Sequence, residues 1–239
     1  MNIAIIFAGG TGQRMNTKTK PKQFLELHGK PILVYTVEQF QNHDKVDKIV
    51  LVMLESWIDY CEKLVSRYQL DKVAAIVPGG KTGQESIYNG LAKAYELFGG
   101  NNTVLIHDGV RPLISSETIS DDIECAEKNG NAITVSPAIE TITMEAEDGS
   151  IGEIVDRSKC RVAKAPQCFK LEDIVAAHKK AQEENRSDFI DSASLMKYYG
   201  HKLFPVEGGP ENIKITTPSD FYIFRAITDA KENSQIFGL

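Results

Sequence analysis

Short apolar runs alternate with longer segments whose apolar residues recur at helical spacing along most of this 239-residue chain. Continuous runs of branched apolar residues are typical of strands that are buried on both faces of a sheet. Segments with apolar residues three and four positions apart predict amphipathic helices instead. We therefore expect strands at 2–8, 48–54, 72–78, 103–107 and 131–138, and helices at 31–42, 55–69, 83–98 and 115–130.

This alternation predicts an α/β fold with a doubly wound, mostly parallel, Rossmann-like sheet, because buried strands need helices on both faces. Pro31 stands at the start of one helix, and Gly99 and Gly130 follow the ends of two others. Proline and glycine favour these positions. No repeat, low-complexity run or linker interrupts the pattern, so we expect a single domain that spans residues 1–239.

Residues 139–165 break this rhythm. TITM and IGEIVDR flank the sequence EAEDGS, and an Asp-Gly turn between two such runs is typical of a β-hairpin. The stretch has too few apolar residues to bury both of its faces, so we interpret it as a projecting β-arm. The αβ pattern resumes at residue 171 and continues through amphipathic segments, a short strand and a closing helix, at 171–185, 191–200, 202–208 and from 218 to about 231.

Composition and charge narrow the classes of function. The net charge of −6 argues against a general nucleic-acid binder, which needs a basic face. The four cysteines form no C-x-x-C pair and have no histidine at metal-ligand spacing, which favours free thiols in a reducing compartment. No run reaches the roughly 18 apolar residues of a membrane span. We therefore expect a cytoplasmic protein with neither a nucleic acid nor a membrane as partner.

The loop after the first predicted strand is basic although the chain as a whole is acidic. AGGTGQRMNTKTKPKQ (8–23) contains Gly9, Gly10 and Gly12 and no acidic residue. Its cations are Arg14, Lys18, Lys20 and Lys22. Glycines beyond a strand's carboxyl end let backbone N–H groups approach an anion. The spacing fits neither the dinucleotide fingerprint nor the P-loop, so we favour another kind of phosphate-binding loop, with a merely solvated basic loop as the alternative.

Further motifs follow this loop along the chain. They are GGKTGQES (79–86), IHDGVRPLI (106–114), AIETI (138–142), IVDRS (154–158), APQCF (165–169), FIDSAS (189–194) and ENIKITTPSDF (211–221). In this order, and together with AGGTGQRM and PKQF, they resemble the cytidylyltransferases that act on 2-C-methyl-D-erythritol 4-phosphate or on ribitol 5-phosphate. The resemblance runs from about residue 3 to 227. It implies the nucleotide-diphospho-sugar transferase type of fold, with CTP as one substrate and pyrophosphate as a product.

The implied reaction is an in-line attack by a substrate phosphate on the α-phosphorus of CTP. Because this nucleophile is already an anion, positioning and charge stabilisation must supply the rate. The resemblance assigns Arg14, Lys22 and Lys214 as the catalytic cations. A carboxylate at the carboxyl edge of the sheet suits Mg²⁺, which prefers oxygen ligands, and the resemblance implies that Asp108, with Glu211, holds this cofactor.

Two glycine-containing segments of this chain match the nucleotide-binding motifs of the family. Backbone groups can read the edge of cytosine without a side chain, which accounts for the Gly-Gly pair. The expected nucleotide-binding residues are Ala8, Gly9, Gly10, Gly12, Gly79, Gly80, Lys81 and Ser86. Relatives usually carry Arg where this chain has Gly83, and we name Lys81 as the candidate for the missing cation.

The resemblance also implies a small polyol phosphate as acceptor, bound by Arg111, Thr141 and Arg157. The last two lie on the arm, which in the family reaches into the partner's site, so we expect a homodimer. Ala165 stands where relatives usually have Thr, which leaves the acceptor open.

Three alternatives remain at this point. AGG and HDGVRPL favour ribitol 5-phosphate as the acceptor, whereas IVDRS favours 2-C-methyl-D-erythritol 4-phosphate. A transferase for another sugar phosphate that uses UTP or TTP is more remote. So is a non-catalytic nucleotide-binding scaffold, which the departures at Gly83 and Ala165 suggest.

Overall fold

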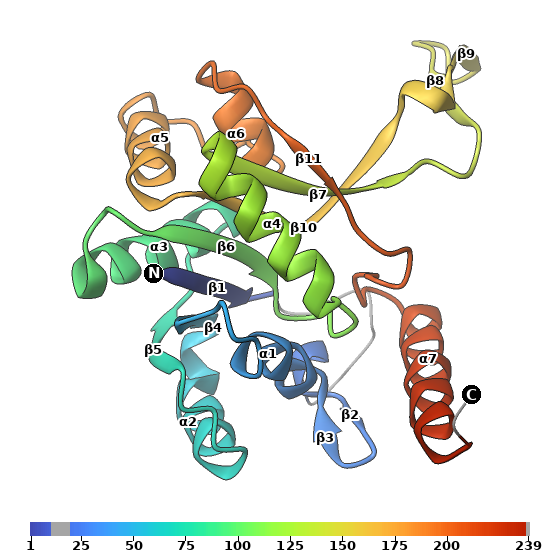
Figure 1. The fold of residues 1–239 in the computed structure, drawn as a ribbon. Helices are drawn as coiled ribbons and strands as arrows, with labels where there is room; N and C mark the ends of the chain where they lie inside the picture. Colours follow the sequence, from blue (N-terminus) through green and yellow to red (C-terminus); the bar gives the residue numbers. More distant parts are fainter. Residues whose placement is uncertain (11–19, 238–239) are drawn as a thin grey trace.

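A sheet runs through the centre of the computed structural model, which describes residues 1–10 and 20–237 (Figure 1). The spatial order of its seven strands is β11-β7-β10-β6-β1-β4-β5. Of these strands, β10 alone runs antiparallel to its neighbours. The strands are β1 (Asn2–Ala8), β4 (Lys48–Met53), β5 (Val73–Pro78), β6 (Thr103–Asp108), β7 (Asn131–Pro137), β10 (Arg161–Lys170) and β11 (Pro205–Glu207). The expected α/β fold with a mostly parallel sheet is confirmed.

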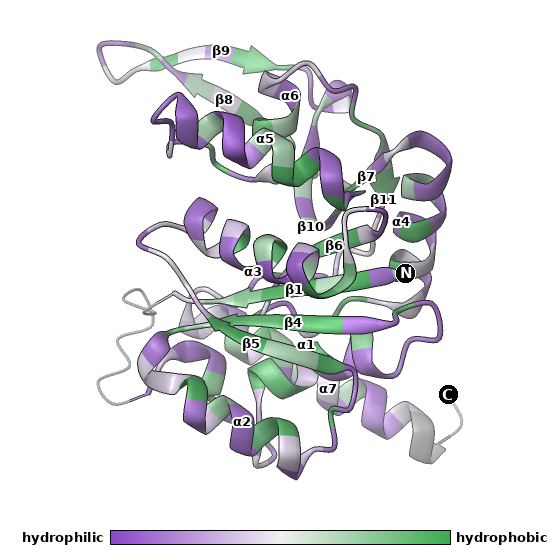
Figure 2. Ribbon diagram, turned by 90° about the vertical axis from the view of Figure 1, so that its left-hand side faces the viewer, coloured by the Kyte–Doolittle hydropathy of each residue, from purple (hydrophilic) through white to green (hydrophobic). Residues whose placement is uncertain are grey.

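Helices pack on both faces of this sheet, which confirms the doubly wound arrangement. One group is α1 (Ile32–Gln41), α2 (Ile58–Arg67) and α4 (Ser116–Asn129), and the other is α3 (Gly83–Phe98), α5 (Leu171–Glu183) and α6 (Ser192–Tyr198). Successive residues of a strand point to opposite faces. Ala4 and Ile6 of β1 therefore pack with the first group, and Ile3 and Ile5 with the second. Figure 2 shows β1 and β4 hydrophobic over most of their length, as burial on both faces requires.

Some boundaries differ from those expected. The helix expected at 55–69 begins as the 3₁₀ turn η3 (Glu55–Trp57), after which α2 follows. The strand expected at 202–208 is shortened to β11. Residues 212–215 form neither a helix nor a strand. These shifts leave the order of the elements unchanged.

Strand β10 is the main element that the hydrophobic pattern did not predict. It lies between β6 and β7, and its register shifts between Ala163 and Gln167. Pro166 falls in this irregular stretch, where its missing N–H interrupts no regular ladder. Cys168 and Phe169 follow, both fully buried, and pack into the two opposite faces of the core. Because polar and apolar residues are mixed around a proline here, the sequence pattern did not predict this central strand.

Strands β8 (Ile142–Glu145) and β9 (Ile151–Val155) form a two-stranded sheet of their own. Figure 1 shows that this hairpin stands away from the central sheet, as expected of the projecting arm. Residues 161–165, which were expected to belong to the arm, are instead part of β10 in the central sheet. The turn of the hairpin contains Gly149 at φ 80°, a conformation that glycine adopts without steric cost. Large apolar side chains on and beside the hairpin are exposed, namely Ile139, Met144, Ile151, Ile154 and Val162. The 3₁₀ turn η4 (Arg157–Lys159) follows β9.

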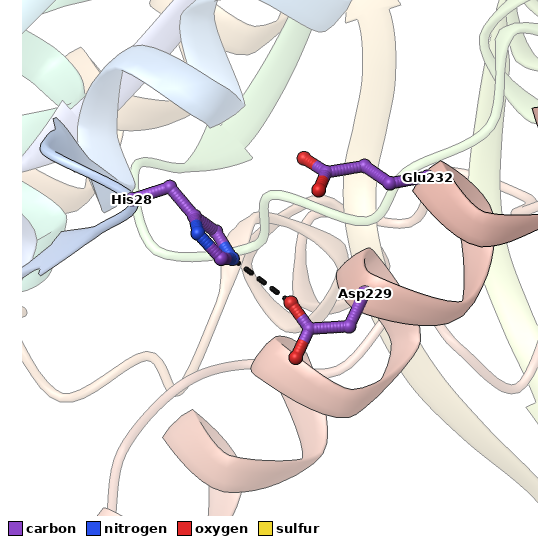
Figure 3. A group of neighbouring side chains, drawn as sticks. All are labelled: His28, Asp229 and Glu232. Carbon is purple, nitrogen blue, oxygen red and sulfur yellow. Dashed lines mark hydrogen bonds and ion pairs between the residues drawn. The ribbon is translucent and has the colours of Figure 1, made fainter. Parts of the chain in front are cut away.

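The closing helix packs against a short hairpin near the start of the chain. These elements are α7 (Pro218–Phe237), β2 (Glu26–Leu27) and β3 (Lys30–Pro31), and the 3₁₀ turn η2 (Lys22–Phe24) precedes the hairpin. Phe224 of α7 is fully buried in the cluster between them. Nearer the surface, His28 Nε2 lies 2.8 Å from Asp229 Oδ1, and Glu232 approaches from the next turn of α7 (Figure 3). None of the helices in the described part of the chain combines the length and apolar character needed to span a bilayer.

Gly90 lets α3 lie close to the sheet, and this contact gives a test of the packing. A Cβ at this position would come within 2.7 Å of Ile5 Cγ2 and Val52 Cγ2. We expect Gly90→Ala to lower the free energy of unfolding by about 1–3 kcal/mol through overpacking, although alanine favours a helix by about 1 kcal/mol. Urea unfolding followed by circular dichroism measures this change.

The matched control lies on the same helix. A Cβ at Gly83 would meet none of the described residues within 4 Å, so Gly83→Ala should keep or raise the stability. Equal stability of the two variants would contradict the close approach of α3 to β1 and β4.

Candidate functional site

A cavity of about 390 Å³ opens at the carboxyl edge of the sheet, beside the ends of β1 and β6. Ligands bind at this edge in open α/β sheets. The charged and amide side chains in its wall are Gln84, Asp108, Arg111, Lys164, Gln167, Asp191 and Lys214. They come from one helix, two strands and loops that are distant in the sequence. The fold therefore gathers at this cavity three of the residues that the sequence assigned, one from each of the catalytic, metal and acceptor-binding groups, which are Lys214, Asp108 and Arg111.

Asp108 ends β6 and stands at the centre of this charged group. Its Oδ1 lies 2.6 Å from Lys214 Nζ, and its Oδ2 accepts a hydrogen bond of 2.8 Å from Arg111 Nε. The residue is 6% exposed. Burial alone would raise its pKa, but the charges of Lys214 and Arg111 outweigh burial and lower the pKa of Asp108 below its usual range. Asp108 is therefore ionised at neutral pH and holds two cations at the cavity.

Backbone contacts position the loop that carries Lys214. Arg111 Nη1 donates to the carbonyl of Asn212 at 3.0 Å. Lys22 Nζ donates to the carbonyl of Ile215 at 3.1 Å. The structure thus places Lys22, a second residue expected to be catalytic, against the residue that follows Lys214.

The glycines expected to bind the nucleotide converge around one hydroxyl. Ser86 Oγ accepts a hydrogen bond of 3.0 Å from Gly80 N and donates one of 2.8 Å to the carbonyl of Thr82. A Cβ on Gly79 would come within 3.0 Å of this oxygen, and one on Gly9 within 3.5 Å. A side chain at Gly79 would therefore crowd Ser86, whereas one at Gly9 would make an ordinary contact with it. Three separate segments, the ends of β1 and β5 and the start of α3, meet here with backbone groups close to one another.

The remaining residues of the opening loop are placed only in part. Ala8 ends β1, and its carbonyl accepts a hydrogen bond of 2.6 Å from Gln23 Nε2. Gln23 is buried and anchors the far end of the loop, a role that the sequence did not indicate. Gly10 is exposed, with open space around its Cα. Gly12 and Arg14 lie outside the described residues.

Lys81 does not line the Asp108 cavity. It lines a neighbouring hollow of about 410 Å³ together with Arg186, and its backbone N–H donates to Glu85 Oε2 at 2.7 Å. Gly83, the position where relatives usually carry Arg, lines the Asp108 cavity itself. Lys81, the cation expected to replace that Arg, therefore lies beside the Asp108 cavity rather than in its wall.

The acceptor residues on the arm lie apart from the cavity of their own chain. Thr141 and Arg157 are exposed and do not belong to its wall. Arg157 Nη1 donates to the carbonyl of Ile139 at 2.7 Å. Glu211 is also exposed and lies outside this wall, although its charge acts on Lys164 across the loop.

Within residues 1–10 and 20–237, one cluster contains three side chains of the types that bind metal ions. They are His28, Asp229 and Glu232, whose ligand atoms lie within 4.8 Å of one another (Figure 3). This group lies between α7 and the β2–β3 hairpin rather than at Asp108. Any metal at Asp108 must therefore draw most of its ligands from substrate phosphates and water.

His107 precedes Asp108 and packs in the core. It is fully buried, its ring lies 4.9 Å from that of Phe40, and its Nε2 is 3.1 Å from the carbonyl of Arg111. Burial lowers the pKa of His107 to about 4. The ring is neutral at physiological pH, so Nε2–H donates to that carbonyl and helps to hold the turn that carries Arg111.

Lys164, Gln167 and Asp191 are residues of the wall that were not singled out from the sequence. Gln167 Nε2 donates to Asp191 Oδ2 at 2.8 Å, while the other oxygen of Asp191 caps α6. Lys164 Nζ contacts two carbonyls of the loop that precedes Lys214. Gln167 and Asp191 lie within APQCF and FIDSAS, so those motifs were the available signal. Lys164 precedes its motif and lies on the strand that was not expected.

Comparisons with known proteins show which sequences and structures this chain resembles. The family model described as "IspD: 2-C-methyl-D-erythritol 4-phosphate cytidylyltransferase" matches residues 2–230. A ribitol-5-phosphate cytidylyltransferase of Vibrio parahaemolyticus is 51% identical over 100% of both chains. A 2-C-methyl-D-erythritol 4-phosphate cytidylyltransferase of Clostridium acetobutylicum is 42% identical over 98% of this chain and 99% of its own. The solved 4-diphosphocytidyl-2C-methyl-D-erythritol synthase of Anaerococcus prevotii superposes with a TM-score of 0.81 at 28% identity, over 95% of this chain and 96% of that one.

The buried pairing of Asp108 predicts a specific dependence of stability on pH. Asp108→Asn removes the shared charge and leaves Arg111 and Lys214 facing each other, so we expect a loss of about 1.5–3 kcal/mol at pH 7, the usual contribution of a hydrogen bond to a charged group. A carboxyl whose pKa is lower in the folded state stabilises the fold above its unfolded pKa of about 3.9. That contribution disappears as the pH falls through the lowered value.

Urea unfolding of both proteins at pH 7 and pH 3 measures this difference. The wild type and Asp108→Asn should differ at pH 7, and the difference should be smaller at pH 3, because the contribution of Asp108 declines once the pH falls below its unfolded pKa. Asp71→Asn, at an exposed position, is the matched control and should equal the wild type at both. A constant difference between the wild type and Asp108→Asn at the two pH values would contradict the pairing.

Proposed function

Because this chain belongs to the IspD family of cytidylyltransferases, we propose that it joins CMP from CTP to a small polyol phosphate and releases pyrophosphate. The observation that carries the proposal is the buried carboxylate of Asp108, shared by Arg111 and Lys214 in the wall of one cavity. The reaction brings two anions together. Cations that are already held in place offset that repulsion without reorganising during the reaction.

The residues of the site act by positioning and by electrostatics. The acceptor phosphate oxygen is anionic and attacks the α-phosphorus of CTP, so no side chain has to remove a proton. Lys214 and Lys22 stabilise the charge that builds up on the phosphates, and Asp108 holds Lys214 in place. Arg14, outside the described residues, is proposed as the third cation of this set.

CTP is proposed to bind on the side of the cavity where the glycines converge. Gly9, Gly79 and Gly80 place backbone groups close to Ser86, and such groups can read a base edge without a side chain. Lys81 in the adjoining hollow supplies a cation near the same segment. The start of α3 lies here as well, and the N-terminus of a helix favours an anion.

Mg²⁺ is proposed as the cofactor, and the donors present suit it. Mg²⁺ is usually held by one or two carboxylates together with substrate phosphates, and an ionised carboxylate has lone pairs beyond the two that Asp108 uses. Asp108 is therefore the proposed ligand, with Glu211 as an outer carboxylate. When bound, the ion supplies further neutralisation of the phosphate charge.

D-Ribitol 5-phosphate is the proposed acceptor, with CDP-ribitol as product. Relatives named as ribitol-5-phosphate cytidylyltransferases are 51% identical over the full length of this chain, whereas those named for 2-C-methyl-D-erythritol 4-phosphate reach 42%. The second acceptor remains the alternative, since the matching family model carries its name.

The proposal is tested by measuring pyrophosphate release from CTP with ribitol 5-phosphate, 2-C-methyl-D-erythritol 4-phosphate and glycerol 3-phosphate side by side. Ribitol 5-phosphate should give a kcat/KM at least about tenfold above the others, because a site that hydrogen-bonds substrate hydroxyls discriminates strongly among them. Replacing CTP by UTP should abolish release. No release with any acceptor would contradict the enzymatic reading and favour a nucleotide-binding scaffold.

The arm is proposed to join two copies of this chain in a homodimer. Its exposed apolar side chains, which include Ile139, Ile151 and Ile154, form the kind of surface that marks an interaction site. Thr141 and Arg157 would then reach the acceptor phosphate in the partner's cavity, where an arginine fork suits a phosphate.

Complementation between two inactive variants tests this arrangement. Arg157→Ala and Lys214→Met should each be inactive as homodimers. When the two are co-expressed with different tags, half of the dimers are mixed and each mixed dimer has one intact site, so about a quarter of the wild-type activity should return. Isolated mixed dimers without activity would show that the arm serves its own chain or no site.

A further inference from the structure

Lys164 lines two neighbouring cavities, and among the residues described in their walls it is the one common to both. It lines the Asp108 cavity and also a hollow of about 520 Å³ at the root of the arm, beside Ile139, Ile142 and Val162. It lies on β10, which joins the arm to the central sheet. Lys164 is therefore placed where the reaction cavity meets the base of the arm.

The ammonium group of Lys164 lacks a carboxylate partner in the part of the chain that the structure describes. Its Nζ donates to the carbonyls of Gly209 and Pro210 at 3.3 and 3.4 Å, which is the long end of the range for such bonds. No ion pair among those residues includes it. An ammonium group has three donors, so the third N–H remains available for a ligand.

The two carboxylates of the cavity wall are already engaged. Asp108 is shared by Arg111 and Lys214. Asp191 accepts from Gln167 and from the N-terminal turn of α6. Glu211 acts on Lys164 from a longer distance, but neither carboxylate of this wall forms an ion pair with it in the described part of the chain. A half-buried cation without such a pair attracts an anion.

The order of the strands indicates which anion reaches it. The glycines around Ser86 belong to the ends of β1 and β5 and to α3, on one side of β6. Strand β10 lies on the other side of β6. Asp108, at the end of β6, lies between them, so a nucleotide held at the glycines presents its phosphates to Asp108 and the second substrate approaches from the side of Lys164.

We propose that Lys164 binds the phosphate of the acceptor, as a cation that acts beside Arg111 and within the same chain. This inference rests on the proposed function for the nature of the anion. It gives each cavity a phosphate-binding group of its own, in addition to those that a partner's arm would supply.

Two substitutions at this position test the inference. Lys164→Gln keeps a donor for the loop carbonyls and removes the charge, whereas Lys164→Arg keeps the charge. Because a hydrogen bond to a charged group contributes about 1.5–3 kcal/mol, Lys164→Gln should raise the KM for ribitol 5-phosphate by about tenfold or more. The KM for CTP should stay within about twofold of the wild type, and Lys164→Arg should restore most of the acceptor affinity. Lys179→Met, at an exposed position on α5, is the matched control and should equal the wild type.

An unchanged acceptor KM in Lys164→Gln, or a rise confined to the KM for CTP, would overturn the inference. Thermal unfolding with inorganic phosphate as the probe gives an independent readout. Phosphate should raise the melting temperature of the wild type and of Lys179→Met more than that of Lys164→Gln, and an equal rise in all three would count against Lys164. If the wild type turns over no acceptor, the proposed function fails, while the phosphate experiment still decides whether Lys164 binds an anion.

Discussion

The buried carboxylate of Asp108 is the interaction on which the site depends. A charge at 6% exposure is costly unless it is paired and hydrogen-bonded, and here Arg111 and Lys214 provide the pairing at 2.8 and 2.6 Å. Because Lys214 comes from a loop far along the chain, this one carboxylate joins the end of β6 to the segment before α7. The cations that result point at a cavity rather than at bulk water, which suits them to phosphates.

The surrounding fold restricts the movement of Asp108, Arg111 and Lys214. Strands β1 and β6 are buried on both faces by helices, so the residues at their carboxyl ends have little freedom. His107, neutral and fully buried, supports the turn that carries Arg111. Lys22 contacts the loop of Lys214, and α7 packs beside the hairpin that follows Lys22. A reaction that relies on positioning two anions needs such rigidity.

Much of this arrangement could be predicted from the sequence, for physical reasons that differ between its parts. Continuous apolar runs predicted the five parallel strands at 2–8, 48–54, 72–78, 103–107 and 131–138, since burial on both faces leaves little room for polar residues. Asp108 and Lys214 were identified because a strand end and a motif marked them. Strand β10 could not be predicted, since Pro166 and its polar neighbours argue against a central strand unless an irregular register is known. Lys164 was missed with it, because only the neighbours that β10 acquires in the fold show that its charge faces a cavity.

The cations that Asp108 holds are proposed to form the centre of cytidylyl transfer. The most direct measurement is ³¹P NMR of CTP and ribitol 5-phosphate incubated with the wild type or with Lys214→Met. With the wild type, the monoester signal should give way to those of a diphosphate diester and of pyrophosphate. The same conversion should be about 10²–10³ times slower with a folded Lys214→Met, as is typical when one charge-stabilising group is removed. Equal rates for the two proteins would contradict the account.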